Sequence, residues 1–169
     1  MKLGKLSLDI LESLLKSVPL RDPRVILGPS PGEDAAIIDF GNRVMVAKTD
    51  PITFANDMIG WYSVQINAND VACCGAKPRW FMATLLVPPD FHECQIKAIF
   101  QQIVEACESL DISLIGGHTE ITKSLNNPII SGSMLGEAEK SSYVTTSGAR
   151  EGDSILITKG IAIEGTALL

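Results

Sequence analysis

The sequence lacks several features that would assign a functional class directly. No apolar run approaches the roughly 20 residues of a membrane-spanning helix, and no apolar signal-peptide segment follows the first residues. Basic residues are outnumbered, since 14 Lys and Arg stand against 20 Asp and Glu, a formal net charge of −6. A general nucleic-acid binder needs a basic face against the phosphates. We therefore expect a cytoplasmic protein that binds neither membrane nor nucleic acid.

Cysteine and nucleotide-binding patterns of the common kinds are also missing. None of the cysteines forms a CxxC pair, and two are adjacent, which suits neither a zinc site nor a disulfide framework. We expect reduced, mostly buried thiols at Cys73, Cys74, Cys94 and Cys107. The motifs GxxxxGK(S/T) and GxGxxG are absent as well, which argues against P-loop and Rossmann sites.

What the chain does have is enough apolar material for a core, with 46% hydrophobic residues among 169. Hydrophobic periodicity predicts helices over 6–17, 59–75 and 92–110, and strands over 35–40, 43–48, 80–87, 112–115, 129–137 and 154–158. The turn Gly41-Asn42 makes the first two strands a hairpin. The pattern therefore predicts an α+β fold, with a mixed, mostly antiparallel sheet and helices on one face.

Acidic residues recur beside turns and at an expected strand end. Glu33 and Asp34 follow a glycine, Asp50 ends a predicted strand, and Asp70 closes the run Asn67-Ala68-Asn69-Asp70 on a helix. Carboxylates from separate elements are the usual way to hold Mg²⁺ on a substrate phosphate. Each acid taken alone is also a common cap or turn residue. The Asn-Ala-Asn-Asp run is harder to explain in that way, because it is poor helix material.

A glycine pair follows the strand predicted at 112–115. Gly116 and Gly117 would let backbone N–H groups approach a phosphate closely, and His118 comes next. Paired glycines more often mark turns, and a single histidine is more often structural than a ligand. A neutral imidazole is also a poor Mg²⁺ ligand, so we do not expect His118 to bind the metal.

Five stretches, taken in order, resemble the superfamily of AIR synthetase, thiamine-monophosphate kinase, selenophosphate synthetase, formylglycinamidine synthase and the hydrogenase-maturation protein HypE. These stretches are 32–36, 49–50, 67–70 with 75–78, 116–119, and 148–153. Within the superfamily, the chain most resembles archaeal-type AIR synthase-related and HypE-like proteins. That finer likeness is carried by residues 50–53, 75–80, 116–120 and 160–167.

The resemblance implies a PurM-type N-terminal domain, an α+β fold that dimerises through its sheet. It also implies that ATP and Mg²⁺ sit in a cleft lined by acidic residues, and that the chemistry is phosphoryl transfer. The metal ligands that it implies are Asp34, Asp50, Asp70 and, secondarily, Glu33. The nucleotide or phosphate contacts that it implies are Gly116, Gly117, Thr49, Asn67 and His118.

The polar stretch 139–150 is the expected domain boundary, with residues 1–150 forming the ATP and Mg²⁺ domain and 151–169 beginning a second, truncated one. Two functions follow as hypotheses. One is an ATP-dependent, dimeric enzyme that activates a small substrate or a maturation intermediate. The other is a non-catalytic dimerising module or scaffold that needs a partner chain carrying the C-terminal domain. A purely structural role for all the acids is a third reading, which the cost of unpaired carboxylates near a core disfavours.

Overall fold

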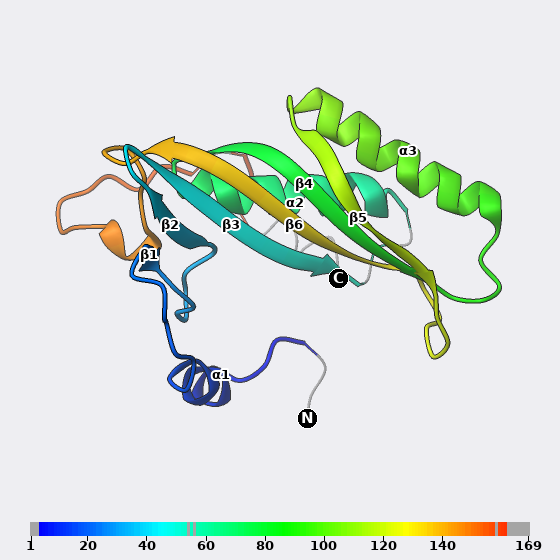
Figure 1. Ribbon diagram of the computed structural model, residues 1–169, viewed down its shortest axis with the longest axis horizontal. Coiled ribbons are helices and arrows are strands. Elements are labelled where there is room, and N and C mark those ends of the chain that lie inside the picture. Colours follow the sequence, from blue (N-terminus) through cyan, green and yellow to red (C-terminus); the bar gives the residue numbers. More distant parts are fainter. Residues whose placement is uncertain (1–3, 54, 56, 158, 162–169) are drawn as a thin grey trace.

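A computed structural model of the chain describes residues 4–53, 55, 57–157 and 159–161. Three helices and six strands follow one another along it, and a short 3₁₀ turn comes last (Figure 1). In chain order they are α1 (Leu8–Leu15), β1 (Val25–Leu27), β2 (Ala36–Phe40), β3 (Arg43–Ile52), α2 (Ile59–Cys73), β4 (Lys77–Val87), α3 (Glu93–Ser109), β5 (Ser113–Ile121), β6 (Ile129–Glu139) and η1 (Thr146–Gly148).

The six strands form one mixed sheet in the order β1-β2-β3-β6-β4-β5. Strands β4 and β5 run parallel, joined by a crossover through α3, and the other neighbouring pairs are antiparallel. The long strands β3, β6 and β4 make the centre of the sheet, and β5 is one edge. The predicted α+β fold with a mixed sheet is confirmed.

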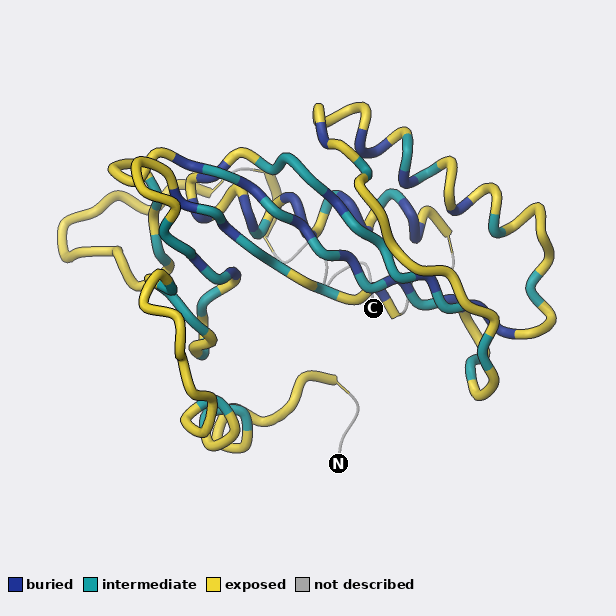
Figure 2. Tube along the Cα trace, in the orientation of Figure 1, coloured by how far each residue is buried: buried dark blue, intermediate teal, exposed yellow. Residues whose placement is uncertain are grey.

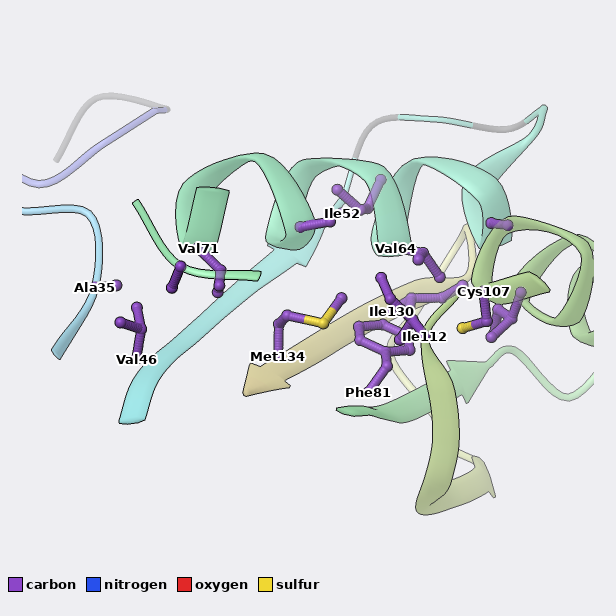
Figure 3. Close-up of a cluster of buried hydrophobic side chains, with 14 of the residues drawn as sticks. Ala35, Val46, Ile52, Val64, Val71, Phe81, Cys107, Ile112, Ile130 and Met134 are labelled. Atoms are coloured by element: carbon purple, nitrogen blue, oxygen red, sulfur yellow. The ribbon is translucent and has the colours of Figure 1, made fainter. Parts of the chain in front are cut away.

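Helices α2 and α3 pack against one face of the sheet and enclose the core (Figures 1 and 3). Along β6, even-numbered residues are buried and odd-numbered ones are half-buried up to the exposed Glu139, as expected for a strand with one covered face. Figure 2 shows the buried residues gathered where the central strands meet the helices. Fully buried side chains of this core include Val64, Val71, Phe81, Ile103, Ile130 and Met134.

The ends of the two packed helices follow from local backbone chemistry. The side chain of Gln95 accepts a hydrogen bond from the backbone N–H of His92, 2.9 Å long, which satisfies one free donor at the start of α3. Helix α2 ends before Gly75, whose φ of 74° is a left-handed conformation that glycine adopts without strain. Glycine at this position therefore lets the chain turn away from the end of α2.

The largest differences between the structure and the predicted elements lie at four places. Strand β3 continues to Ile52, because β6 pairs with it along its whole length. Strand β5 continues to Ile121, because β4 pairs with it beyond the glycine pair. The short strand β1 was not predicted from the sequence. Residues 154–157 form no strand, contrary to the prediction for 154–158, and Thr158 lies outside the described residues.

The expectation of mostly buried thiols holds for only two of the four cysteines. Cys74 and Cys107 are buried, and burial raises the pKa of Cys107 to about 11. Cys73 and Cys94 are exposed, because they lie on the solvent-facing sides of α2 and α3. All four are free thiols.

Helix α1 extends away from the sheet, and none of its residues is buried (Figures 1 and 2). Among the described residues, no helix has the length and hydropathy needed to cross a membrane.

Candidate functional site

Two of the predicted metal ligands converge on one lysine. Lys48 and Asp50 have the same parity as the buried Val44 and Val46 of β3, so their side chains lie on the helix-covered face. Helix α2 crosses that face and brings Asp70 to the same point. The Lys48 Nζ lies 2.7 Å from the Asp70 Oδ2 and 3.4 Å from the Asp50 Oδ2.

This ion-pair cluster is partly removed from solvent. The side chains of Lys48 and Asp70 are 15% and 22% exposed, and that of Asp50 is 39% exposed. Burial by itself lowers the pKa of Lys48. The hydrogen bond to Asp70 and the charges of Asp70 and Asp50 outweigh that effect and hold the pKa above its usual value. Lys48 is therefore a charged ammonium group throughout the neutral range.

Glu33 and Asp34 lie in the loop before β2, on the side of the molecule where α2 ends. The backbone N–H of Thr146 donates to the Glu33 Oε2 at 3.2 Å. Hydrogen bonding with Thr146, first through its side chain and then through its backbone, outweighs the effect of burial and lowers the pKa of Glu33. The pKa of Cys74 is raised by burial first and then by the negative charges of Asp34, Glu33 and Asp70. Acids from the loop and from α2 thus act on the same thiol. We call these acids together with Asp50, namely Glu33, Asp34, Asp50 and Asp70, the acidic group.

Asn67 lies inside the protein, with no exposed surface. Its Nδ2 donates to the Ser63 carbonyl at 2.8 Å and to the Asp50 carbonyl at 3.3 Å. Its Oδ1 is buried and has no hydrogen-bond partner. The side chain occupies the space above Gly132, where an added Cβ would collide with the Asn67 amide and lie 2.7 Å from the Phe81 ring. In this arrangement, Asn67 anchors the backbone at Asp50.

Thr49 points to the other face of β3 and is exposed. Its hydroxyl donates to the Gly132 carbonyl at 2.7 Å. The hydroxyl of Thr49 and the amide of Asn67 therefore hold the same stretch of β3 and β6 from opposite sides.

The glycine pair lies within β5. The sequence predicted that the strand would end before this pair, but the strand continues beyond it. Gly117 has a φ of 155°, and a Cβ at this position would collide with the Ala83 carbonyl of β4. Glycine is required at Gly117 because the two backbones approach so closely. Gly116 has open space around it.

Strand register places Gly117 of the glycine pair on the same row of the sheet as Asp50. Asp50 pairs with Gly132 of β6, and Gly132 pairs with Ala83 of β4. Ala83 in turn pairs with Gly117 of β5. Three strand spacings separate the ends of this row, roughly 14 Å. Gly117 is thus on the same row as Asp50 but lies on the far side of the sheet's central strands.

His118 lies on the other face. It pairs with Thr84, one position away from the row of Asp50, so its side chain points to the face that α2 and α3 leave open. The imidazole is 63% exposed and lies 3.3 Å from the Glu120 carboxylate. Within one chain, His118 therefore does not contact the acidic group.

Most of the predicted site residues therefore fall into two groups, whereas Thr49 and Asn67 hold the backbone beside Asp50. One is the acidic group, which lies with Lys48, and the other, the glycine group, consists of Gly116, Gly117 and His118. Across the described residues, no three His, Cys, Asp or Glu side chains are close enough together to hold a metal ion. The donor set of the acidic group, carboxylate oxygens, is nevertheless the chemistry that Mg²⁺ requires.

Sequence reasoning did not identify Lys48 as a site residue. The signal was its position two residues before Asp50 on the same strand, which places both side chains on one face. That signal acquires meaning only when α2 adds Asp70 from a distant part of the chain.

Comparisons with known proteins place these residues in a family context. The family model described as AIR synthase related protein, N-terminal domain, matches residues 32–138. A Methanocaldococcus jannaschii protein named for hydrogenase expression and formation is 26% identical over 95% of this chain and 51% of its own length. Aquifex aeolicus thiamine-monophosphate kinase is 26% identical over 82% of this chain and 47% of its own length. Carbamoyl dehydratase HypE of Bradyrhizobium diazoefficiens is 27% identical over 82% and 42%.

A solved structure supports the same placement. AaThiL complexed with AMPPCP and TMP superposes with a TM-score of 0.68 at 25% identity, over 86% of this chain and 45% of that one. The chain spans about half the length of these relatives.

Proposed function

The chain belongs to the AIR synthase related protein family, and on that premise we propose that it binds ATP with Mg²⁺ for phosphoryl transfer to a small substrate or a maturation intermediate. The observation that carries the proposal is the convergence of Asp50 and Asp70, from a strand and a helix, on one cationic nitrogen. Two carboxylates from separate elements, partly shielded from water, already accommodate a positive charge at this position.

The acidic group would hold Mg²⁺ through Asp50 and Asp70, with Asp34 and Glu33 on the adjoining loop as further oxygen donors. Bound there, the ion would neutralise phosphate charge and orient the transferred group. The protein's own contribution is to position the carboxylates. Asn67 does this from the interior, because its amide holds the backbone of Asp50 against α2.

A nucleotide ligand is supported by the relative AaThiL, which has been solved with AMPPCP, a non-hydrolysable analogue of ATP. In this chain the proposed phosphate contacts are the exposed Thr49 and the glycine pair of β5. His118 stays a proposed contact on the open face of the sheet. Because Asn67 has no exposed surface, a direct contact between Asn67 and nucleotide would require the site to open.

A second copy and a second domain complete the proposal. The relatives are about twice as long, and we propose that residues from 151 onward lead into a C-terminal domain or dock with a partner chain that supplies it. We also propose a homodimer through the open face of the sheet. Half-buried apolar side chains lie on that face and outside the core, namely Ile38, Met45, Trp80, Met82 and Leu135.

A non-catalytic dimerising module or scaffold in HypE-like maturation is the second candidate. It is favoured by the absence, within the described residues, of three metal-binding side chains at one point. In that case the nucleotide site would form only with a partner chain.

Calorimetric titration of the chain with ATP, with and without Mg²⁺, tests the proposal. We expect Mg²⁺-dependent binding that Asp70→Asn weakens roughly tenfold or more, because a carboxylate ligand is lost. Asp9→Asn, on the exposed helix α1, is the matched control and should bind like the wild type. Circular dichroism verifies that each variant is folded.

The outcomes separate the candidates. Unchanged affinity in a folded Asp70→Asn protein would contradict the metal role of Asp70. Absence of binding by the wild-type chain, with or without Mg²⁺, would favour the module that needs a partner.

A further inference from the structure

Lys48 occupies the position between Asp50 and Asp70 that a metal bound by both carboxylates would take. Both Oδ2 atoms lie within 3.4 Å of its Nζ. Among the residues that the structure describes, Lys48 is also the one basic side chain that forms an ion pair with any of Glu33, Asp34, Asp50 and Asp70. One ammonium group thus balances the charges of the Asp50 and Asp70 carboxylates.

We propose that Lys48 is the resident counter-ion of the Asp50–Asp70 pair, and that a divalent cation binds these carboxylates by displacing its ammonium group. The inference rests on the proposed function, since it takes Asp50 and Asp70 as metal ligands. It adds a residue that sets how tightly, and with what rearrangement, the metal binds.

Geometry and charge prevent Lys48 and a metal from sharing this position. Mg²⁺ binds oxygen ligands at about 2.0–2.1 Å and brings two positive charges. An ammonium group hydrogen-bonded to the same oxygens would be repelled and would occupy the metal's coordination space. The lysine stem consists of four flexible carbons, so the head group can move away without moving the strand. Asp50 is 39% exposed, which leaves an open side through which the exchange can occur.

The metal-free state explains why a lysine is placed here. Two carboxylates that face each other in a partly desolvated place repel one another, and a positive charge between them removes that cost. Lys48 therefore stabilises the metal-free chain and at the same time weakens metal binding, because its ion pairs must be broken first.

Replacing Lys48 with methionine keeps most of the side-chain volume and removes the charge. Mn²⁺, which takes similar oxygen ligands, is titrated into the full chain without nucleotide, and free Mn²⁺ is followed by electron paramagnetic resonance. We expect Lys48→Met to bind Mn²⁺ on the order of tenfold more tightly than the wild type. Its melting temperature should be lower without metal, and should rise more with Mn²⁺ than that of the wild type.

Two further variants serve as references. Lys48→Arg keeps the positive charge and should bind no more tightly than the wild type. Lys77→Met removes an exposed lysine that pairs with Asp111 at 2.9 Å and with none of the four acids of the proposed site, and it should change neither affinity nor the metal-induced shift.

Equal or weaker Mn²⁺ binding by Lys48→Met, while the wild type binds, would overturn the displacement and leave the proposed metal site intact. Absence of binding by both proteins would overturn the displacement together with the metal part of the proposed function. A Lys48→Met chain that folds only with Mn²⁺ would support the displacement, because the metal then replaces the missing counter-ion.

Discussion

At the scale of single residues, the buried amide of Asn67 links helix α2 to strand β3. It donates to two carbonyl oxygens, at Asp50 and Ser63, and it fills the space left by Gly132. Hydrogen bonds of a buried amide are costly to lose, because neither partner can turn to water instead. Asn67 therefore acts on the site through the backbone of Asp50.

We predict that Asn67→Asp destabilises the chain by at least about 2 kcal/mol, because a buried carboxylate would face the two carbonyl oxygens that now accept from the amide. Asn69→Asp makes the same chemical change two residues away, at an exposed position, and should alter stability by less than about 0.5 kcal/mol. Urea denaturation of the three proteins measures the difference. Equal stability of the two variants would show that Asn67 makes no such contacts in solution.

The sequence identified Asn67 and Asp70 as unusual for a helix, because a polar run beside an apolar face needs a reason. It did not distinguish their environments. Asn67 lies at zero exposure, whereas the side chain of Asp70 is 22% exposed and pairs with Lys48. Helical periodicity separates the faces of α2, but only the position of the sheet decides which face is covered.

At the scale of elements, β5 shows how a glycine pair can belong to a strand. Gly117 passes so close to the Ala83 carbonyl that no side chain fits, and pairing with β4 carries the strand on to Ile121. Glycine is a weak strand former by itself. The sequence alone therefore predicted a strand end at a position where the neighbouring strand maintains the pairing.

We predict that Gly117→Ala costs about 1–3 kcal/mol of stability, because the new Cβ must push β5 away from β4. Gly116→Ala, with open space around it, should cost less than about 0.5 kcal/mol. Thermal unfolding compares the two variants, and hydrogen exchange of β5 amides shows where the change acts. A Gly117→Ala protein as stable as Gly116→Ala would contradict the close approach of the two strands.

At the scale of the whole molecule, α2 and α3 cover one face of the sheet, and no described helix packs on the other. The open face carries the half-buried apolar residues Ile38, Met45, Trp80, Met82 and Leu135, and clustered apolar residues of this kind are typical of an interaction surface. Covering that face with a second copy would remove it from water and would bring the two chains together sheet against sheet.

We predict a dimer at micromolar concentration by light scattering, and we predict that Leu135→Glu converts it to a monomer by placing a charge at the centre of the interface. Phe100→Glu is the control, because Phe100 is 49% exposed on α3, on the covered side of the sheet. It should leave the dimer intact. A wild-type monomer, or a Leu135→Glu dimer, would contradict association through this face.

The sequence by itself determined the types of most elements, the hairpin of β2 and β3, the mixed sheet and the family, because these depend on local periodicity, turn residues and short motifs. The tertiary structure alone decided which site residues meet. Asp50 and Asp70 converge through the crossing of β3 and α2, and Lys48 joins them because side chains alternate along a strand. Gly117 and His118 lie three strands away from Asp50. The order of strands in a sheet is set by long-range pairing, which no local sequence pattern predicts.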